Sequence, residues 1–283
     1  MTDADGKPIR KACPVFPFHG CVSPLQQKCC ITLYNGEPSA RPAVAAAVKA
    51  AQKKGVKVVI ASGRTSFAIE PQILGGIKPD YMICANGAQI LDRQGKLLYS
   101  QDLTAEEMYA LVDFFEDFDY PLAFNFEDNY YVYVEYKAMW EFYKKATGHG
   151  EYVLDGEDQD RHLESMPFGA FAILPPEQVE DFQEKYGYLG LKFVPYRPGY
   201  YDVMQADVDK ARGMERLLEI TGWKPEELVF MGDNDNDVAM LQLAGCSYCM
   251  ANGSEKAKAA AKHIAPGVEE EGVRQVVEAL FLK

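Results

Sequence analysis

The sequence predicts an α/β protein in which a doubly wound, Rossmann-like parallel sheet is interrupted by an inserted domain of mixed α/β structure. Two observations predict the parallel sheet. Short apolar runs such as residues 56–61 and 228–232 have the length of buried strands. Helical patterns separate these runs, which is typical of parallel strands with helical crossovers. A third observation, a change of pattern near residue 88, predicts the insertion.

Regular structure is expected only after Pro38. Before it, scattered prolines and cysteines break any regular period, and only residues 30–34 have the pattern of a strand. We therefore treat residues 1–36 as an irregular part of the first domain. The elements expected next are a helix over 40–54 that ends at Gly55, a buried strand over 56–61, a helix from about Thr65 and a short strand over 81–84.

Residues 88–197 are predicted to form the inserted domain, which leaves residues 1–87 and 198–283 to the core domain. Strands joined by short turns predict an antiparallel sheet with helices on one face. Thr104-Ala105-Glu106-Glu107 is a capping box and marks a helix start. The expected elements are a hairpin over 89–103, helices over 104–118, 138–146 and 177–186, and strands over 122–126, 130–136, 168–174 and 192–196.

The parallel pattern resumes after residue 205. The expected elements are a helix from Lys210, a strand that leads into an acidic turn at 228–237, a strand over 246–250, a helix over 255–262, a strand over 263–265 and a closing helix over 268–281. These segments complete the alternation of strands and helices, so they are predicted to extend the first sheet.

The charge of the chain restricts its partners. The formal net charge is −13, which argues against nucleic acid and against an anionic membrane surface. A small phosphorylated substrate is compatible with this charge, because a local lysine, arginine or metal ion overrides the global field. No apolar run reaches ~18 residues, and the N-terminus lacks a basic-then-apolar signal. We therefore expect a cytoplasmic protein, and no feature specifies an oligomeric state.

The acidic turn after residues 228–232 is the first candidate site. Asp233, Asp235 and Asp237 fall within five residues, and they repel one another unless a cation or a donor offsets their charge. Oxygen ligands without sulfur favour a hard cation such as Mg²⁺. The alternative is a solvated acidic turn. A calcium-binding loop is excluded, because Val238 and Ala244 occupy the positions that need glycine and glutamate.

Other strand ends carry groups that suit a phosphate ester. Ser62 offers a hydroxyl, and the backbone N–H groups of Gly63 and Arg64 follow it at a predicted helix start. Lys210 offers a fixed positive charge. With Asp233 and Asp237 as metal ligands and Asn236 as a neutral donor, these residues form the set that phosphoryl transfer needs.

Taken together, these motifs resemble those of the haloacid-dehalogenase superfamily, in particular the Cof-type phosphatases of subclass IIB. The resemblance covers about residues 37–283. The segments that carry it are Val58-Val59-Ile60-Ala61-Ser62-Gly63-Arg64, Ala85-Asn86-Gly87-Ala88, Asp209-Lys210-Ala211-Arg212-Gly213, Gly232-Asp233-Asn234-Asp235-Asn236-Asp237 and Ala251-Asn252-Gly253. The family combines a doubly wound α/β core with an inserted cap domain, which agrees with the change of pattern near residue 88.

The resemblance implies an activity and roles for the matched residues. Family members hydrolyse phosphate monoesters, often sugar phosphates, with Mg²⁺. By this resemblance, Ser62 binds the phosphoryl group, Lys210 balances its charge, Asp233 ligates Mg²⁺, and Asp237 supports that metal shell together with Asn236. The remaining matched residues, Gly63, Arg64, Asn86 and Gly87, are expected to bind the substrate.

The chain departs from the family at the nucleophile. The family uses the first aspartate of an Asp-x-Asp-Gly-Thr motif after the first core strand, whereas residues 27–33 contain no carboxylate. Asp3-Ala4-Asp5-Gly6 looks similar, but Lys7 replaces the threonine. Three accounts are open: an inactive protein that binds phosphate esters or metal, a displaced carboxylate, or an altered reading of residues 12–35. The abrupt change of composition near Pro38 favours the third.

Overall fold

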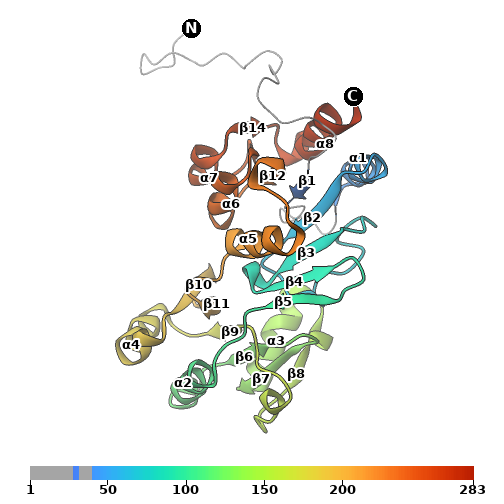
Figure 1. Ribbon diagram of the computed structural model, residues 1–283. Helices are drawn as coiled ribbons and strands as arrows, with labels where there is room; N and C mark the ends of the chain where they lie inside the picture. The colour runs from blue at the N-terminus through green and yellow to red at the C-terminus, as the bar shows by residue number, and fades with distance from the viewer. Residues whose placement is uncertain (1–27, 32–39) are drawn as a thin grey trace, which may run out of the picture.

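The computed structural model describes residues 28–31 and 40–283, and two β-sheets organise this part of the chain (Figure 1). The larger sheet contains eight described strands in the order β14-β13-β12-β1-β2-β3-β4-β5. The smaller sheet contains six, in the order β10-β11-β9-β6-β7-β8. The predicted fold class, a doubly wound α/β core with an added mixed α/β unit, is confirmed.

The larger sheet is parallel except at one edge. Its strands are β1 (Lys28–Ile31), β2 (Lys57–Ala61), β3 (Tyr81–Cys84), β4 (Gln89–Asp92), β5 (Leu97–Ser100), β12 (Leu228–Gly232), β13 (Cys246–Met250) and β14 (His263–Ala265). Strands β4 and β5 form an antiparallel hairpin beside β3. Strand β1 lies between β2 and β12, with Ile31 opposite both Ile60 and Met231. The strand order reverses at β1, and open α/β sheets bind ligands at such a reversal.

Helices cover both faces of the larger sheet (Figure 1). On one face lie α1 (Pro42–Lys53) and α8 (Gly272–Val277), and on the other α5 (Lys210–Thr221), α6 (Val238–Leu243) and α7 (Glu255–Ala260). The neighbouring residues Val58 and Val59 of β2 are both buried, each in the core of a different face. Burial on both faces explains why β2 and β12 carry consecutive apolar residues, instead of apolar residues that alternate with polar ones.

The smaller sheet carries helices on both faces. Its strands are β6 (Leu122–Asn125), β7 (Tyr130–Val134), β8 (Val153–Asp155), β9 (Ala170–Ile173), β10 (Leu191–Arg197) and β11 (Tyr200–Gln205), and its helices are α2 (Ala105–Glu116), α3 (Tyr136–Thr147) and α4 (Pro176–Tyr186). The predicted capping box of α2 is confirmed. Helices α2 and α4 cover one face, but α3 packs on the other, so the expectation of helices on a single face is wrong.

The sequence predicts domain boundaries at residues 88 and 197. The chain passes from one sheet to the other further along, after β5 and after β11. The hairpin formed by β4 and β5 belongs to the larger sheet, and β11 extends the smaller sheet to Gln205. Ile90 of β4 pairs with Ile83 and is buried in the core of the larger sheet. An alternating hairpin pattern shows that one face is buried, but it does not show which sheet that face covers.

The helix expected from about Thr65 does not form. Residues 65–76 are a series of turns between β2 and β3. Two features oppose a helix there. Pro71 has no N–H group and biases the preceding residue away from the helical region. Gly75 and Gly76 both have positive φ angles, which end helical structure.

The chain passes between the two sheets twice, at residues 101–104 and 206–209, and one side chain joins these crossings. The Gln101 side-chain amide donates to Gln205 Oε1 and to Asp207 Oδ1, each at 2.8 Å. The Gln101 backbone N–H donates to the Ala88 carbonyl of the larger sheet at 2.9 Å. We call this group of contacts the Gln101 clasp.

A second set of contacts joins the sheets away from the crossings. Thr65 Oγ1 and the Tyr130 hydroxyl lie 3.0 Å apart, and the Tyr152 hydroxyl donates to Glu70 Oε1 at 2.8 Å. The Phe67 ring lies edge-on to Tyr130, with 4.9 Å between the ring centroids. These contacts bind the irregular segment 65–76 to the smaller sheet. Within the described residues, no helix has the length and apolarity to cross a membrane.

A pair of phenylalanine truncations tests the core of the smaller sheet. Phe124 of β6 is fully buried in the core of the smaller sheet, whereas Phe118 is 46% exposed. We expect Phe124→Ala to lower the free energy of unfolding by about 3–5 kcal/mol, because it removes apolar burial and leaves a cavity. Phe118→Ala is the matched control and is expected to cost about 1 kcal/mol or less. Urea denaturation measures both values. Equal losses would contradict the packing described here.

Candidate active site at the carboxyl ends of the parallel strands

Ser62 and Asp233 lie on either side of the end of β1. Ser62 is two residues beyond Ile60, Asp233 is two beyond Met231, and both of these strand residues pair with Ile31. The register therefore brings a hydroxyl and a carboxylate to the same edge of the sheet. Residues 32–39, which follow β1 and include the position expected for the nucleophile, lie outside the described residues.

The loop after β2 holds the Ser62 hydroxyl in a defined position. The Ser62 N–H donates to the Ile83 carbonyl at 2.8 Å, and the Arg64 N–H donates to Ser62 Oγ at 3.0 Å. The Arg64 N–H, one of the predicted phosphate donors, therefore already donates to Ser62 in this structure. Because Ser62 Oγ accepts from the backbone, its own O–H proton is left to donate to a ligand. Gly63 is exposed, and Arg64 is partly buried.

Residues 85–87 form a turn that supports this loop. The Asn86 N–H donates to the Ser62 carbonyl at 3.1 Å, and the Ala85 N–H donates to the Arg64 carbonyl at 2.8 Å. Asn86 is in the left-handed region, with a φ angle of 53°. Its side chain lies over Gly63, where an added Cβ would be only 3.0 Å from Asn86 Oδ1. The structure thus brings the predicted residues Ser62, Gly63 and Asn86 together.

Two glycines allow α5 to reach this turn. A Cβ on Gly87 would lie 2.0 Å from the Asp209 carbonyl oxygen, and one on Gly213 would lie 2.8 Å from Gly87 Cα. A side chain at either glycine would collide with the facing residues, so helix α5 begins directly against the end of β3. Asp209 caps the helix by accepting from the Arg212 N–H at 2.8 Å. This packing brings the next residue, Lys210, to the edge of the strands.

Lys210 forms a buried ion pair with Asp237. Lys210 Nζ lies 2.8 Å from Asp237 Oδ1, and the two side chains are 4% and 0% exposed. Asp237 Oδ2 accepts from the backbone N–H groups of Asp233 and Asn234, at 3.0 and 3.2 Å. Both oxygens of Asp237 are thus engaged by the protein. The geometry makes Asp237 the group that orients Lys210 and closes the acidic turn.

Asp233 differs from Asp237 in its surroundings. Its side chain is 5% exposed, and its carboxylate accepts no hydrogen bond from the described residues. Burial, and after it the nearby charge of Asp237, raise the pKa of the Asp233 carboxyl, Lys210 opposes this effect, and the resulting pKa is about 6. A buried carboxylate without a donor is suited to a cation. Of the predicted metal ligands, Asp233 has its oxygens available.

The remaining residues of the acidic turn face outward. Asp235 accepts from Ser254 Oγ at 2.6 Å and from Lys256 Nζ at 2.9 Å, on the surface. Asn236 is exposed in the short helical turn Asp235–Asp237. The 251–254 turn packs beneath the acidic turn. The Ser254 N–H donates to the Asp233 carbonyl at 2.8 Å, and a Cβ on Gly253 would lie only 2.7 Å from the same oxygen. In the acidic turn, Asp233 and Asp237 are therefore buried, and Asp237 is the partner of Lys210, whereas residues 234–236 are exposed to solvent.

One residue near the site carries no sequence motif that points to it. Asp202 on β11 of the smaller sheet accepts a hydrogen bond from the Asn86 side-chain amide, with 3.4 Å between Nδ2 and Oδ2. Burial raises the pKa of the Asp202 carboxyl to about 6, and the Asn86 bond opposes this effect. The smaller sheet thus contributes a carboxylate to the turn that supports Ser62.

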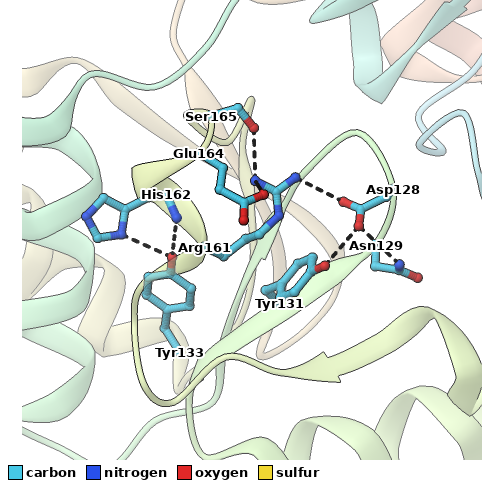
Figure 2. A network of polar contacts seen from close by, with 8 residues as sticks. All are labelled: Asp128, Asn129, Tyr131, Tyr133, Arg161, His162, Glu164 and Ser165. Carbon is cyan, nitrogen blue, oxygen red and sulfur yellow. Dashed lines mark hydrogen bonds and ion pairs between the residues drawn. The ribbon is translucent and has the colours of Figure 1, made fainter.

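A separate surface hollow of about 500 Å³ lies on the smaller sheet and contains none of the predicted site residues. Five carboxylates line it, from Asp128, Asp155, Asp158, Asp160 and Glu164. Figure 2 shows the network beside it, in which the Arg161 guanidinium contacts Asp128 and Ser165. The same guanidinium lies over the Phe126 ring, 4.6 Å from its centroid. These contacts fasten the loop before β9 to the turn between β6 and β7, which is a structural role.

Comparison with known proteins agrees with the fold and the motifs. Residues 32–277 match the family described as haloacid dehalogenase-like hydrolase, and the chain belongs to this family. One relative is the 5-amino-6-(5-phospho-D-ribitylamino)uracil phosphatase YcsE of Bacillus subtilis. It is 26% identical over 251 residues, which cover 87% of this chain and 90% of the relative.

Solved structures share the fold. A hypothetical protein of Geobacillus kaustophilus superimposes with a TM-score of 0.80 at 23% identity, over 91% of this chain and 100% of the other. The subclass IIB sugar phosphatase BT4131 superimposes with a TM-score of 0.73 at 22% identity, over 89% of this chain and 98% of the other. The chain therefore has the subclass IIB fold that its motifs predict.

Two lysine substitutions test the buried ion pair. We expect Lys210→Met to lower the free energy of unfolding by about 3–5 kcal/mol, because it leaves the Asp237 charge buried without its partner. Lys256→Met is the matched control. Lys256 pairs with Asp235 at a similar distance of 2.9 Å but is 78% exposed, so we expect a change below about 1 kcal/mol. Chemical denaturation of both variants gives the comparison, and similar losses would refute the assignment.

Two glycine substitutions test the contact between α5 and the 85–87 turn. Gly87 and Gly95 both have positive φ angles, but only Gly87 has a backbone atom where a Cβ would lie. We expect Gly95→Ala to cost about 1 kcal/mol through backbone strain alone. Gly87→Ala should cost about 3 kcal/mol or more, since α5 must also move away. Thermal unfolding of the two variants decides this, and equal melting temperatures would count against the close approach.

Proposed function

We propose that the protein hydrolyses small phosphate monoesters with the help of Mg²⁺. The observation that carries this proposal is the free, buried Asp233 carboxylate beside the Lys210–Asp237 ion pair, at the strand ends that also hold Ser62. Phosphoryl transfer needs a cation, fixed positive charge and aimed donors around the phosphoryl group. These are the groups that the family's motifs bring together here.

The chain's own residues supply most of the phosphate site. The Ser62 hydroxyl accepts one hydrogen bond from the Arg64 N–H and keeps its proton to donate to a phosphoryl oxygen. Lys210 supplies positive charge, and Asp237 restrains its ammonium group so that little side-chain entropy is lost when the ligand binds. Asn86 supports the Ser62 loop from below through its N–H group.

Asp233 is the residue that would hold the metal. In the described part of the chain, no three His, Cys, Asp or Glu side chains converge as a complete metal site. This suits Mg²⁺, which keeps several waters and uses one or two carboxylates together with phosphate oxygens. A bound Mg²⁺ would offset the negative charge of the phosphate ester.

The proposed substrate is a small phosphorylated metabolite of the sugar-phosphate type. The net charge of −13 makes nucleic acid an unsuitable partner, whereas Lys210 gives a small anion a local positive charge. The relative YcsE is named as a phosphatase of a phosphorylated ribityl compound, and BT4131 is named as a sugar phosphatase. These names support the substrate class.

A second candidate function is binding of phosphate esters without turnover. The observation that favours it is the composition of the N-terminal region, in which no Asp or Glu occurs between Asp5 and Glu37. The family's nucleophile is a carboxylate directly after the strand that β1 represents. Without that carboxylate the site keeps its phosphate and metal groups but lacks the group that attacks phosphorus.

Hydrolysis of an aryl phosphate, measured with Mg²⁺ and with EDTA, tests the proposal. We expect phosphate release that requires Mg²⁺ and falls at least about a hundredfold in Asp233→Ala, because the metal loses its buried ligand. Asp235→Ala is the matched control. It removes a carboxylate two residues away that pairs with Lys256 on the surface, so the rate should change less than about twofold.

The outcomes separate the two candidates. Mg²⁺-dependent turnover would support hydrolysis and would direct the search for the nucleophile to Asp3, Asp5 and Glu37. No turnover, with Mg²⁺ and inorganic phosphate still raising the melting temperature of the wild type but not of Asp233→Ala, would support binding alone. Activity that is indifferent to both Mg²⁺ and Asp233 would refute the proposal.

A further inference from the structure

We propose that Asp202 of the smaller sheet is a positioning residue for phosphate binding, because it holds the Asn86 side chain against the Ser62–Arg64 loop of the larger sheet. The inference rests on the proposed function and adds to it: the phosphate site is complete only when strand β11 lies against the 85–87 turn. Asp202 is assigned to act through Asn86 and not on the substrate itself.

The Asn86 side chain lies between the phosphate loop and Asp202. Its Nδ2 donates to Asp202 Oδ2 at 3.4 Å, and its Oδ1 is the atom nearest to the space where Gly63 would carry a Cβ. The Asn86 backbone is in the left-handed region, and its N–H donates to the Ser62 carbonyl. A restraint on the Asn86 side chain therefore restrains the backbone that carries Ser62.

Strand β11 directs Asp202 toward this turn. Its side chains alternate, so Tyr200, Asp202 and Met204 share one face, and Tyr201 and Val203 pack in the core on the other. Met204 is buried together with Ala85 and Ala88, the residues that flank Asn86 and Gly87. This apolar contact fixes β11 beside the turn, and Asp202 lies one position along the same face of the strand.

A carboxylate is suited to this role because it only accepts hydrogen bonds when ionised. The two ends of the Asn86 amide have nearly the same shape, and an acceptor beside them selects the orientation in which the NH₂ group faces β11. The Asp202 carboxyl has a raised pKa of about 6 and so is ionised at pH 7.5. Tyr130, whose pKa the Asp202 charge helps to raise, remains neutral there.

Binding of inorganic phosphate, measured by calorimetry at pH 7.5 with Mg²⁺, tests the inference through a double-mutant cycle. Asp202→Ala should weaken phosphate binding about tenfold, the size expected for loss of a hydrogen bond to a charged group. In the Asn86→Ala background the same change should have less than about a twofold effect, because there is no amide left to position. Asp202→Asn retains an acceptor oxygen and should recover most of the affinity.

Asp207→Asn is the control for charge, because it keeps an acceptor oxygen for Gln101 in the Gln101 clasp. It removes an equal charge from the exposed segment five residues further along, which contacts Gln101 and not Asn86, and phosphate affinity should change less than about twofold. Circular dichroism and the melting temperature verify that each variant is folded, and Asp202→Asn keeps the test valid if Asp202→Ala does not fold.

Each result has a defined meaning. The inference is overturned if Asp202→Ala binds phosphate like the wild type, if its effect is equally large without the Asn86 amide, or if Asp207→Asn has the same effect. If the wild type itself does not bind phosphate with Mg²⁺, the proposed function fails and this inference fails with it. If the wild type binds and the cycle is additive, only this inference fails.

Discussion

The buried ion pair between Lys210 and Asp237 is the constraint on which the site depends. Two charges removed from water are costly unless each is satisfied, and here Asp237 also accepts two backbone N–H groups of its own turn. Three nearby glycines provide the space that this ion pair needs. Gly87 and Gly213 let α5 bring the lysine to the strand ends, and Gly232 leaves the space in which the Asp237 side chain folds back.

The positions of Ser62, Lys210 and Asp233 could be predicted from the sequence because parallel strands end at a common edge. Each residue follows a strand or begins a helix, so the alternation of elements was enough to place them together. The division of labour between Asp233 and Asp237 could not be predicted. Both are carboxylates of one short turn, and the lysine that distinguishes them lies 27 residues away in sequence.

Other features of the fold depend on contacts that no local pattern records. The hairpin of β4 and β5 has a buried face, but only its pairing with β3 assigns that face to the larger sheet. The turns over residues 65–76 depend on Pro71 and on Gly75 and Gly76, which outweigh the position after a strand where a crossover helix is usual. Asp202 joins the site through a tertiary contact with Asn86, far from it in the chain.

The Gln101 clasp joins the two linkers that run between the sheets. The two linkers are hydrogen-bonded to one another and to Ala88, so they form one joined connection and not two independent ones. The contacts of Tyr130 with Thr65 and of Tyr152 with Glu70 are a second connection, so a change in the angle between the sheets would have to break them. The orientation of the two sheets is therefore held at two separate places: at the clasped linkers, and at the tyrosine contacts with segment 65–76, which follows Ser62 in the chain.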